Sequence, residues 1–239
     1  MPSKPPAQPF RLHIEGTRVK VAIRVSKRAR RIALKVDWRG EVSLTIPVRA
    51  SRQAALDFAQ TQGSWLKERL AAVPSQVAFA DGARLPILGT KMTIRHHPEA
   101  RRGVWVEGNQ ICVSGEAEHL PRRVTEWLRR EARRELMKRA KAKASSIGRE
   151  LLSIKVSDMA SRWGSCSASG AMSFSWRLIL APPFVLDYLA AHEVAHIVHM
   201  NHSAQFWKLA RRLHPETDRA EVWLKIHGAN LHRYGATWE

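Results

Sequence analysis

The chain is poor in cysteine and has no long apolar run. Its 239 residues include only Cys112 and Cys166, which excludes a disulfide framework and a zinc site built from several thiolates. No run of about 18 apolar residues occurs, so no membrane-spanning helix is expected. The first residues, Met1–Pro6, lack the apolar segment of a signal peptide. We therefore expect a cytoplasmic protein that does not contact membranes.

Acidic residues are also scarce. The sequence has 21 Asp and Glu against 40 Lys and Arg, a formal net charge of +19. A positive field attracts nucleic acid, anionic membranes or acidic substrates, although arginine-rich surfaces can also be merely solvated. Because such a surface can contact phosphates without reading bases, nucleic acid or a nucleotide is a candidate partner. The basic residues gather in two stretches: Lys27, Arg28, Arg30 and Arg31, then Arg122, Arg123, Arg129, Arg130, Arg133, Arg134, Lys138, Arg139, Lys141 and Lys143.

The first part of the sequence alternates apolar with polar or small residues, as half-buried strands do. The alternation covers residues 19–25, 32–36 and 42–46, with a turn at Trp38-Arg39-Gly40. It predicts an antiparallel meander with one buried face.

A helix and further strands follow this meander. Ser51 is a candidate N-cap for a helix that Pro74 ends. Strands are then expected at about 85–96 and 104–113, with a turn at Gly108-Asn109 in the second. No internal repeat or low-complexity linker is evident. We assign residues 1–115 to an N-terminal strand-rich accessory region and residues 116–239 to a catalytic domain, in an α+β fold.

A long helix is predicted over residues 121–147. Apolar residues recur there at helical spacing, which indicates a core-facing stripe: Val124, Leu128, Ala132, Leu136, Ala140, Ala144 and Ile147. We expect this helix to lie behind the helix that carries the histidines described next. Strands near 153–159 and 171–176 are expected on either side of a loop.

The segment HEVAH at residues 192–196, followed by His202, carries the chemistry. Residues four apart lie on one helical face, so His192 and His196 can turn ring nitrogens toward one ion. Neutral imidazole suits Zn²⁺, and a catalytic zinc site keeps three protein ligands with an open position for water. Bound zinc lowers the pKa of water toward about 7. Glu193 is therefore the candidate general base, acting on a zinc-bound water.

The third zinc ligand is harder to identify from the sequence than the first two. His199 lies on the same helical face, but at roughly 1.5 Å rise per residue it is about 10 Å along the axis from His192. If the helix stops near Met200-Asn201, His202 can fold back onto the metal, and it is our choice. Other zinc hydrolases take a glutamate from a later helix, which makes Glu216 and Glu221 the alternatives.

Several motifs in order resemble the YgjP-like metallopeptidase family, which is related to the SprT-like metalloproteases. They are RWGSCS at 162–167, MSFSWRL at 172–178, HEVAH at 192–196, NHS at 201–203 and FW at 206–207. The resemblance is dense over about residues 153–232. It implies a zincin-like metallopeptidase domain, zinc bound by His192, His196 and His202, a catalytic Glu193, and the RWGSC loop near the active site. It implies no particular substrate, and a nucleotide pyrophosphatase activity has also been attached to the group.

The RWGSC segment allows chemical and structural interpretations. Arg162 is a candidate substrate or transition-state contact, or it caps a loop. Cys166 is either a redox-sensitive thiolate near zinc or a small buried residue, and we favour the latter. Trp163 and Trp176 are expected to fill core. Strand 171–176 is a candidate edge along which an extended peptide could pair.

Three functions from different classes remain. The first, which we adopt, is zinc-dependent peptide hydrolysis with a peptide or protein substrate. The second is metal-dependent pyrophosphate hydrolysis of a nucleoside triphosphate, for which no Walker-type glycine loop or carboxylate cluster is visible. The third is a nucleic-acid-binding protein with a structural zinc, against which an intact Glu193 argues.

Overall fold

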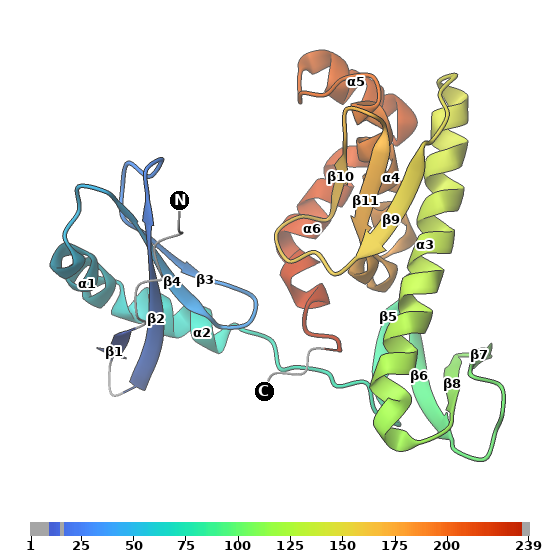
Figure 1. Ribbon diagram of the computed structural model, residues 1–239, viewed down its shortest axis with the longest axis horizontal. Coiled ribbons are helices and arrows are strands. Elements are labelled where there is room, and N and C mark those ends of the chain that lie inside the picture. Colours follow the sequence, from blue (N-terminus) through green and yellow to red (C-terminus); the bar gives the residue numbers. More distant parts are fainter. Residues whose placement is uncertain (1–9, 15–16, 236–239) are drawn as a thin grey trace, which may run out of the picture. The chain divides into compact units, whose positions relative to one another are not determined.

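The computed structural model describes residues 10–14 and 17–235 and divides the chain into two compact units. The first unit is residues 1–75 and the second is residues 76–239 (Figure 1). Each unit combines a sheet with helices, so the expected mixture of α and β structure is confirmed. Over the described residues, no helix is both long and apolar enough to cross a membrane.

The first unit contains a four-stranded sheet in the order β1-β2-β4-β3. Its strands are β1 (Phe10–Ile14), β2 (Thr17–Ser26), β3 (Ala33–Val36) and β4 (Val42–Pro47). The predicted antiparallel meander is wrong in one respect, because β2 and β4 pair in parallel. Alternation defines which face of a strand is buried but not which strands are neighbours. Val21, Ile23, Leu44 and Ile46 do lie in the core as the alternation predicts.

Two helices complete this unit where one was predicted. Ser51 caps α1 (Arg52–Thr61), since its side chain accepts a hydrogen bond from the Ala54 backbone nitrogen. The helix breaks at Gln62, and α2 (Gly63–Ala71) follows before Pro74. Glycine next to Gln62 weakens a continuous helix, which accounts for the break. Buried Ala55, Ala59 and Leu66 attach both helices to the sheet core.

The second unit begins with a sheet of the same topology, β5-β6-β8-β7, again with a parallel central pair. Its strands are β5 (Arg84–Ile87), β6 (Thr90–His97), β7 (Val104–Glu107) and β8 (Gln110–Ser114). The two four-stranded sheets are therefore a structural repeat, and the expectation that the chain has no internal repeat is wrong.

The division between units does not coincide with the predicted boundary at residue 115. Ile94, Ile111 and Val113 of the second sheet share one core with Val124 and Leu128 of the long helix that follows. Residues 76–115 therefore fold with the C-terminal part. The accessory and catalytic roles that we assigned to the two regions remain predictions.

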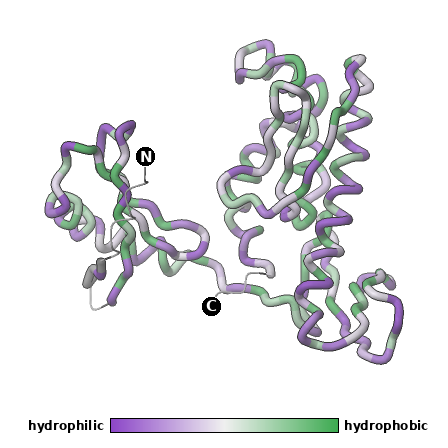
Figure 2. Tube along the Cα trace, in the orientation of Figure 1, coloured by the Kyte–Doolittle hydropathy of each residue, from purple (hydrophilic) through white to green (hydrophobic). Residues whose placement is uncertain are grey.

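The long helix α3 (Leu120–Ser146) is confirmed, and a short 3₁₀ segment (Ala117–His119) precedes it. Figure 2 shows hydrophobic and hydrophilic residues alternating along it, as an amphipathic helix requires. Its first part lies beside β8 and its last part beside β9 (Figure 1). Six residues of the predicted apolar stripe are buried: Val124, Leu128, Ala132, Leu136, Ala140 and Ala144. The seventh, Ile147, follows the last helical residue and is partly buried.

A three-stranded sheet in the order β10-β11-β9 follows α3. Its strands are β9 (Ser153–Ser157), β10 (Gly164–Cys166) and β11 (Ala171–Ser175), and a 3₁₀ segment (Trp176–Leu180) comes next. The prediction that the RWGSC segment is a loop is partly wrong, because Gly164–Cys166 forms a strand that pairs antiparallel with β11. The expectation that strand 171–176 presents an open edge is also wrong, because β11 is paired on both sides. In the described part of this sheet, β10 is an edge.

Three helices form the C-terminal part: α4 (Pro183–His196), α5 (Ala204–Leu213) and α6 (Thr217–Leu231). Residues are buried on nearly every side of α4, as expected of a helix inside a core. It packs against α3, α5, α6 and β10, so the prediction that α3 lies behind the histidine helix is confirmed.

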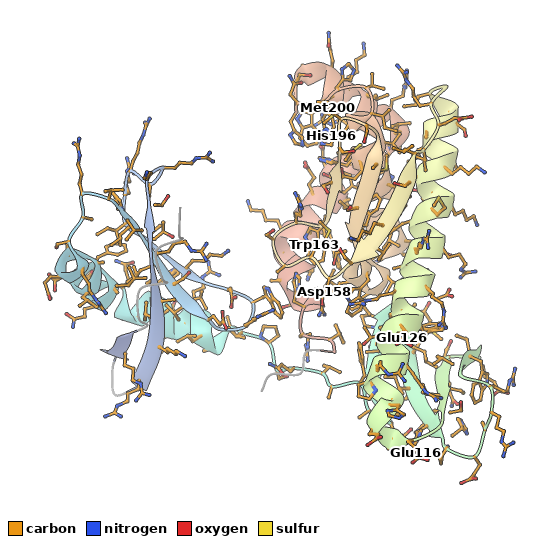
Figure 3. The ribbon with its side chains drawn as sticks, viewed as in Figure 1. Glu116, Glu126, Asp158, Trp163, His196 and Met200 are labelled. Carbon is orange, nitrogen blue, oxygen red and sulfur yellow. The ribbon has the colours of Figure 1, made fainter. Side chains whose placement is uncertain are left out.

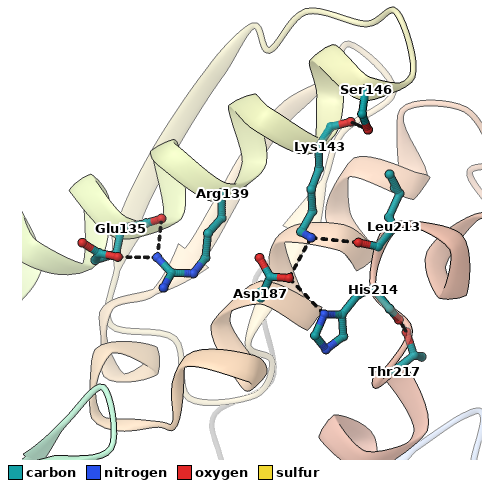
Figure 4. A network of polar contacts seen from close by, with 8 residues as sticks. All are labelled: Glu135, Arg139, Lys143, Ser146, Asp187, Leu213, His214 and Thr217. Atoms are coloured by element: carbon teal, nitrogen blue, oxygen red, sulfur yellow. Dashed lines mark hydrogen bonds and ion pairs between the residues drawn. The ribbon is translucent and has the colours of Figure 1, made fainter.

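An ion-pair network fixes α4 against its neighbours (Figure 4). The Lys143 Nζ of α3 donates to Asp187 Oδ2 at 2.8 Å and to the Leu213 carbonyl at 2.9 Å. His214 Nδ1 lies 3.0 Å from the same Asp187 oxygen. Burial would raise the pKa of Asp187, but the hydrogen bonds from His214 and Lys143 outweigh it and hold the pKa at about 2. Asp187 therefore stays ionised and ties three helices together at neutral pH.

Candidate active site

The two histidines and the glutamate of the HEVAH segment lie in the last turns of α4. The rings of His192 and His196 are 5.0 Å apart between centroids, as expected for residues four apart on one helical face. The helix ends at His196, earlier than the predicted stop near Met200-Asn201. Backbone bonds from Ile197, Val198 and His199 to Val194 and Ala195 close this last turn.

The turn after α4 brings His202 back to the end of the helix. His202 comes directly before Ser203, whose side chain accepts a hydrogen bond from the Phe206 backbone nitrogen and caps α5. In this arrangement His202 Nε2 lies 3.1 Å from His192 Nε2. The sequence argument that His202 folds back from outside the helix therefore describes its observed position.

Ring nitrogens of His192, His196 and His202 all lie within 4.8 Å of one another. Two nitrogens that each lie about 2.0–2.1 Å from a tetrahedral ion are roughly 3.4 Å apart, so the His192–His202 spacing suits a shared ion. The set is three imidazoles without a thiolate, which is a donor set typical of catalytic zinc. These residues fit the metal that a metallohydrolase requires.

The Nδ1 atoms of His192 and His196 have partners outside the cluster. His196 Nδ1 donates to the His199 carbonyl at 3.0 Å, which leaves Nε2 for the cluster. Tyr188 Oη lies 3.3 Å from His192 Nδ1 and donates to Glu221 Oε1 at 3.0 Å. Tyr188 lies four residues before His192 on the same helical face, and this spacing is the signal in the sequence that indicates the contact.

Glu216 and Glu221, the alternative third ligands, lie outside the histidine cluster. Glu221 accepts the Tyr188 hydroxyl on the far side of the His192 ring, and Glu216 pairs with Arg219. Neither belongs to the group of metal-ligand atoms found among the described residues. The side chain of His199 is also outside that group, and only its carbonyl takes part.

His192 and His196 are suited to be neutral at pH 7 because the pKa of each is lowered. Burial, together with the neighbouring His196 and His202, lowers the pKa of His192 to about 4. Burial also lowers the pKa of His196, although its bond to the His199 carbonyl opposes this. Because a metal ligand must present an unprotonated nitrogen, these shifts favour binding of a cation.

Glu193 is buried beside the cluster, with only 3% of its surface exposed. Its Oε2 is buried without a hydrogen-bond partner among the described residues. Burial raises the pKa of Glu193 to about 8, and the charge of Arg162 partly opposes this rise. The side chain of Arg162 is exposed. A cation at the histidines would further favour the ionised carboxylate, as a general base requires.

Strand β10 approaches Glu193 so closely that its first residue must be small. A Cβ placed on Gly164 would lie 2.3 Å from Glu193 Oε1 and 2.9 Å from its carboxyl carbon. The glycine of the RWGSC motif therefore leaves space for the carboxylate, a reason that the sequence alone did not reveal.

Trp163 and Cys166 of the RWGSC segment are partly buried and pack against the core. Burial, with the nearby Glu193 charge, raises the pKa of Cys166 to about 11. The thiol therefore stays protonated at neutral pH, as the favoured interpretation of a small packed residue requires. Trp163 packs against the core and its ring lies 5.0 Å from that of His232, while Trp176 is fully buried.

Aromatic side chains of α5 form a wall around the histidines. Phe206 is buried, with ring centroids 4.9 Å from His192 and 4.5 Å from His196. Trp207 lies 5.7 Å from the His202 ring. These rings restrict the orientation of the imidazoles. Metal sites depend on such surrounding residues to orient their ligands.

Comparison with known proteins identifies the family. The YgjP-like metallopeptidase domain matches residues 30–227, whereas no curated protein matches the chain. A solved structure, the metallopeptidase zymogen of Pyrococcus abyssi abylysin, is similar at 16% identity with a TM-score of 0.36. That similarity covers 41% of this chain and 97% of the other. Because the family match spans most of the sequence and the whole histidine segment, the chain belongs to the YgjP-like metallopeptidase family.

Proposed function

We propose that the chain is a zinc-dependent metallopeptidase in which His192, His196 and His202 hold the ion and Glu193 activates water. The observation that supports this proposal most strongly is the convergence of three imidazoles within 4.8 Å, next to a buried carboxylate. A buried glutamate without a partner is costly unless it has a chemical role. When bound, zinc would polarise the scissile carbonyl and acidify a water molecule.

The proposed reaction uses Glu193 twice. Its carboxylate accepts a proton from water as the water oxygen attacks the carbonyl carbon of the peptide bond. The tetrahedral intermediate then collapses with cleavage of the carbon–nitrogen bond, and Glu193 returns the proton to the leaving amine. The products are a carboxylate and an amine. The fixed ring positions of His192 and His196 keep the cluster and Glu193 in one geometry throughout.

Strand β10 is the proposed binding edge for an extended substrate. In the described sheet, β10 pairs with another strand on one side only. Its first residue, Gly164, lies close to the Glu193 carboxylate. A peptide that pairs with an open strand edge gains backbone hydrogen bonds without requiring a particular sequence. Arg162, which precedes β10 and is exposed, is a proposed contact for the substrate carbonyl oxygen.

A substrate panel tests this function. Zinc-loaded protein is incubated with a mixed peptide library and, separately, with nucleoside triphosphates, and each is repeated after chelation. We expect peptide cleavage, detected by mass spectrometry, that chelation abolishes and zinc restores. Release of pyrophosphate without any peptide cleavage would instead support the nucleotide hydrolase and reject the peptidase.

Replacing Gly164 by Ala should impair catalysis without unfolding the protein. The added methyl group would overlap Glu193 Oε1, so the carboxylate must move, and a displacement of about 1 Å can cost on the order of 10²-fold in rate. Peptidase rate and thermal unfolding are measured beside Ser153→Ala, a control at an exposed residue of β9, the opposite edge of the same sheet. A folded Gly164→Ala variant with the wild-type rate would contradict the assigned close contact.

A further inference from the structure

The two four-stranded sheets repeat in sequence as well as in topology. The motif Ile-x-Gly-Thr occurs in the sequence at residues 14–17 and 87–90, and in each sheet its Ile and Thr pair across the first two strands. The following segments, IRVSKRARR at 23–31 and IRHHPEARR at 94–102, share Ile-Arg and Ala-Arg-Arg in the same register. In both sheets the Arg-Arg pair lies in the connection from the second strand to the third.

In the second unit this connection forms one wall of a cavity of about 710 Å³, and the beginning of α3 forms another. We call this cavity the arginine cleft. Its lining includes five arginines and a single carboxylate, that of Glu126. The arginines are Arg101, Arg102, Arg122, Arg123 and Arg130. The cleft therefore concentrates positive charge that its one carboxylate neutralises only in part.

Three of these guanidinium groups are held in position. Arg123 donates to the Ser114 carbonyl and lies 3.3 Å from the Ser114 hydroxyl. Arg102 lies over the Trp105 ring at 5.0 Å, and Arg122 donates to Glu126 at 2.9 Å. Fixing such side chains before binding reduces the entropy that a ligand must overcome.

The remaining two arginines are available for a ligand. Arg101 and Arg130 are exposed, and neither has a side-chain hydrogen bond or ion pair within the described part of the chain. A guanidinium presents a planar fork of donors that matches phosphate oxygens. In Figure 3, Glu126 of the cleft and the labelled His196 lie toward opposite ends of the second unit. The arginine cleft is thus separate from the histidine cluster.

We propose that the arginine cleft binds the phosphodiester backbone of nucleic acid, without reading bases, and that the basic loop of residues 27–31 is a second copy of this binding element. Five guanidinium groups exceed what one phosphate requires, which favours a chain of phosphates over a single one. The repeat supports the second half of the proposal, since Arg30 and Arg31 match Arg101 and Arg102 and are likewise exposed. Two such elements on one chain would increase affinity for a polymer by raising the effective concentration.

Charge reversal in the full-length protein tests this proposal. Binding of a fluorescent single-stranded and a duplex oligonucleotide is measured by anisotropy from about 50 to about 200 mM salt, a range over which several phosphate contacts are readily detected. Arg101→Glu with Arg130→Glu should weaken binding at least tenfold. The slope of log affinity against log salt should fall by roughly two units for duplex, since each lost phosphate contact removes about 0.9. Arg30→Glu with Arg31→Glu should produce a comparable, separate loss.

The control changes the same net charge elsewhere. Lys155→Glu with Lys225→Glu reverses two exposed residues on β9 and α6, away from the cleft lining. Equal weakening in this variant would show a general charge effect and overturn the proposal. So would an absence of oligonucleotide binding at low salt, or competition by inorganic phosphate or polyglutamate at charge concentrations equal to that of the oligonucleotide. Circular dichroism of each variant verifies the fold.

Discussion

Replacing Glu193 by Gln is expected to lower the rate of peptide hydrolysis by about 10²–10⁴-fold, the range typical of losing a general base. Glutamine has nearly the same shape but cannot accept the proton from water. Since Glu193 is not among the clustered ligand atoms, zinc content should stay at the wild-type level. The combination of lost turnover and retained metal is specific to a residue that acts on the proton rather than on the ion.

Turnover of a peptide from the library and zinc content by elemental analysis together test this expectation. Glu150→Gln, a change at an exposed glutamate after α3, serves as the matched control and should leave both values unchanged. If Glu193→Gln cleaves peptide at the wild-type rate, another group must activate water. The assignment of Glu193 as the base would then be wrong.

Replacing His202 by Ala is expected to have the largest effect on metal affinity that leaves α4 intact. His202 lies outside the helix and is exposed, so its loss removes a ligand nitrogen without creating a buried cavity. Loss of a residue that merely supports a ligand costs roughly 10–100-fold in affinity, and loss of a ligand should exceed this. Zinc affinity is measured by competition with a chelator.

His199→Ala provides the comparison for this experiment. The structure uses only the His199 carbonyl, which bonds to His196 Nδ1 and is retained in an alanine variant. Zinc affinity should therefore be nearly unchanged, although His199 is closer in sequence to the HEVAH segment than His202. Full zinc occupancy in His202→Ala, or a larger loss in His199→Ala, would reverse the choice of third ligand.

The sequence was informative about this cluster because helical spacing is a local property. A separation of four residues suffices to place His192 and His196 on one face, whatever the rest of the fold does. The position of His202 required an additional argument about where the helix stops. The helix ends at His196 rather than near residue 200, and the observed turn still returns His202 to the cluster.

Features that depend on distant segments could not be predicted in the same way. The contact of Gly164 with Glu193 joins β10 to α4, and the bond from Tyr188 to Glu221 joins α4 to α6. Strand alternation predicted the buried faces of β2 and β4 but not their parallel pairing, because pairing depends on the path of the connecting chain. Neither kind of information has a periodic signal in the sequence.

The strand order of the first unit has a practical consequence for expression of shortened versions. The family match begins at residue 30, within the connection between β2 and β3. Strand β2 lies between β1 and β4, so a protein that started there would lose the central neighbour of β4. One edge of β4, the strand that carries the core residues Leu44 and Ile46, would then be unpaired. An exposed apolar strand edge promotes aggregation. Boundaries for recombinant production should therefore follow the sheet rather than the domain match.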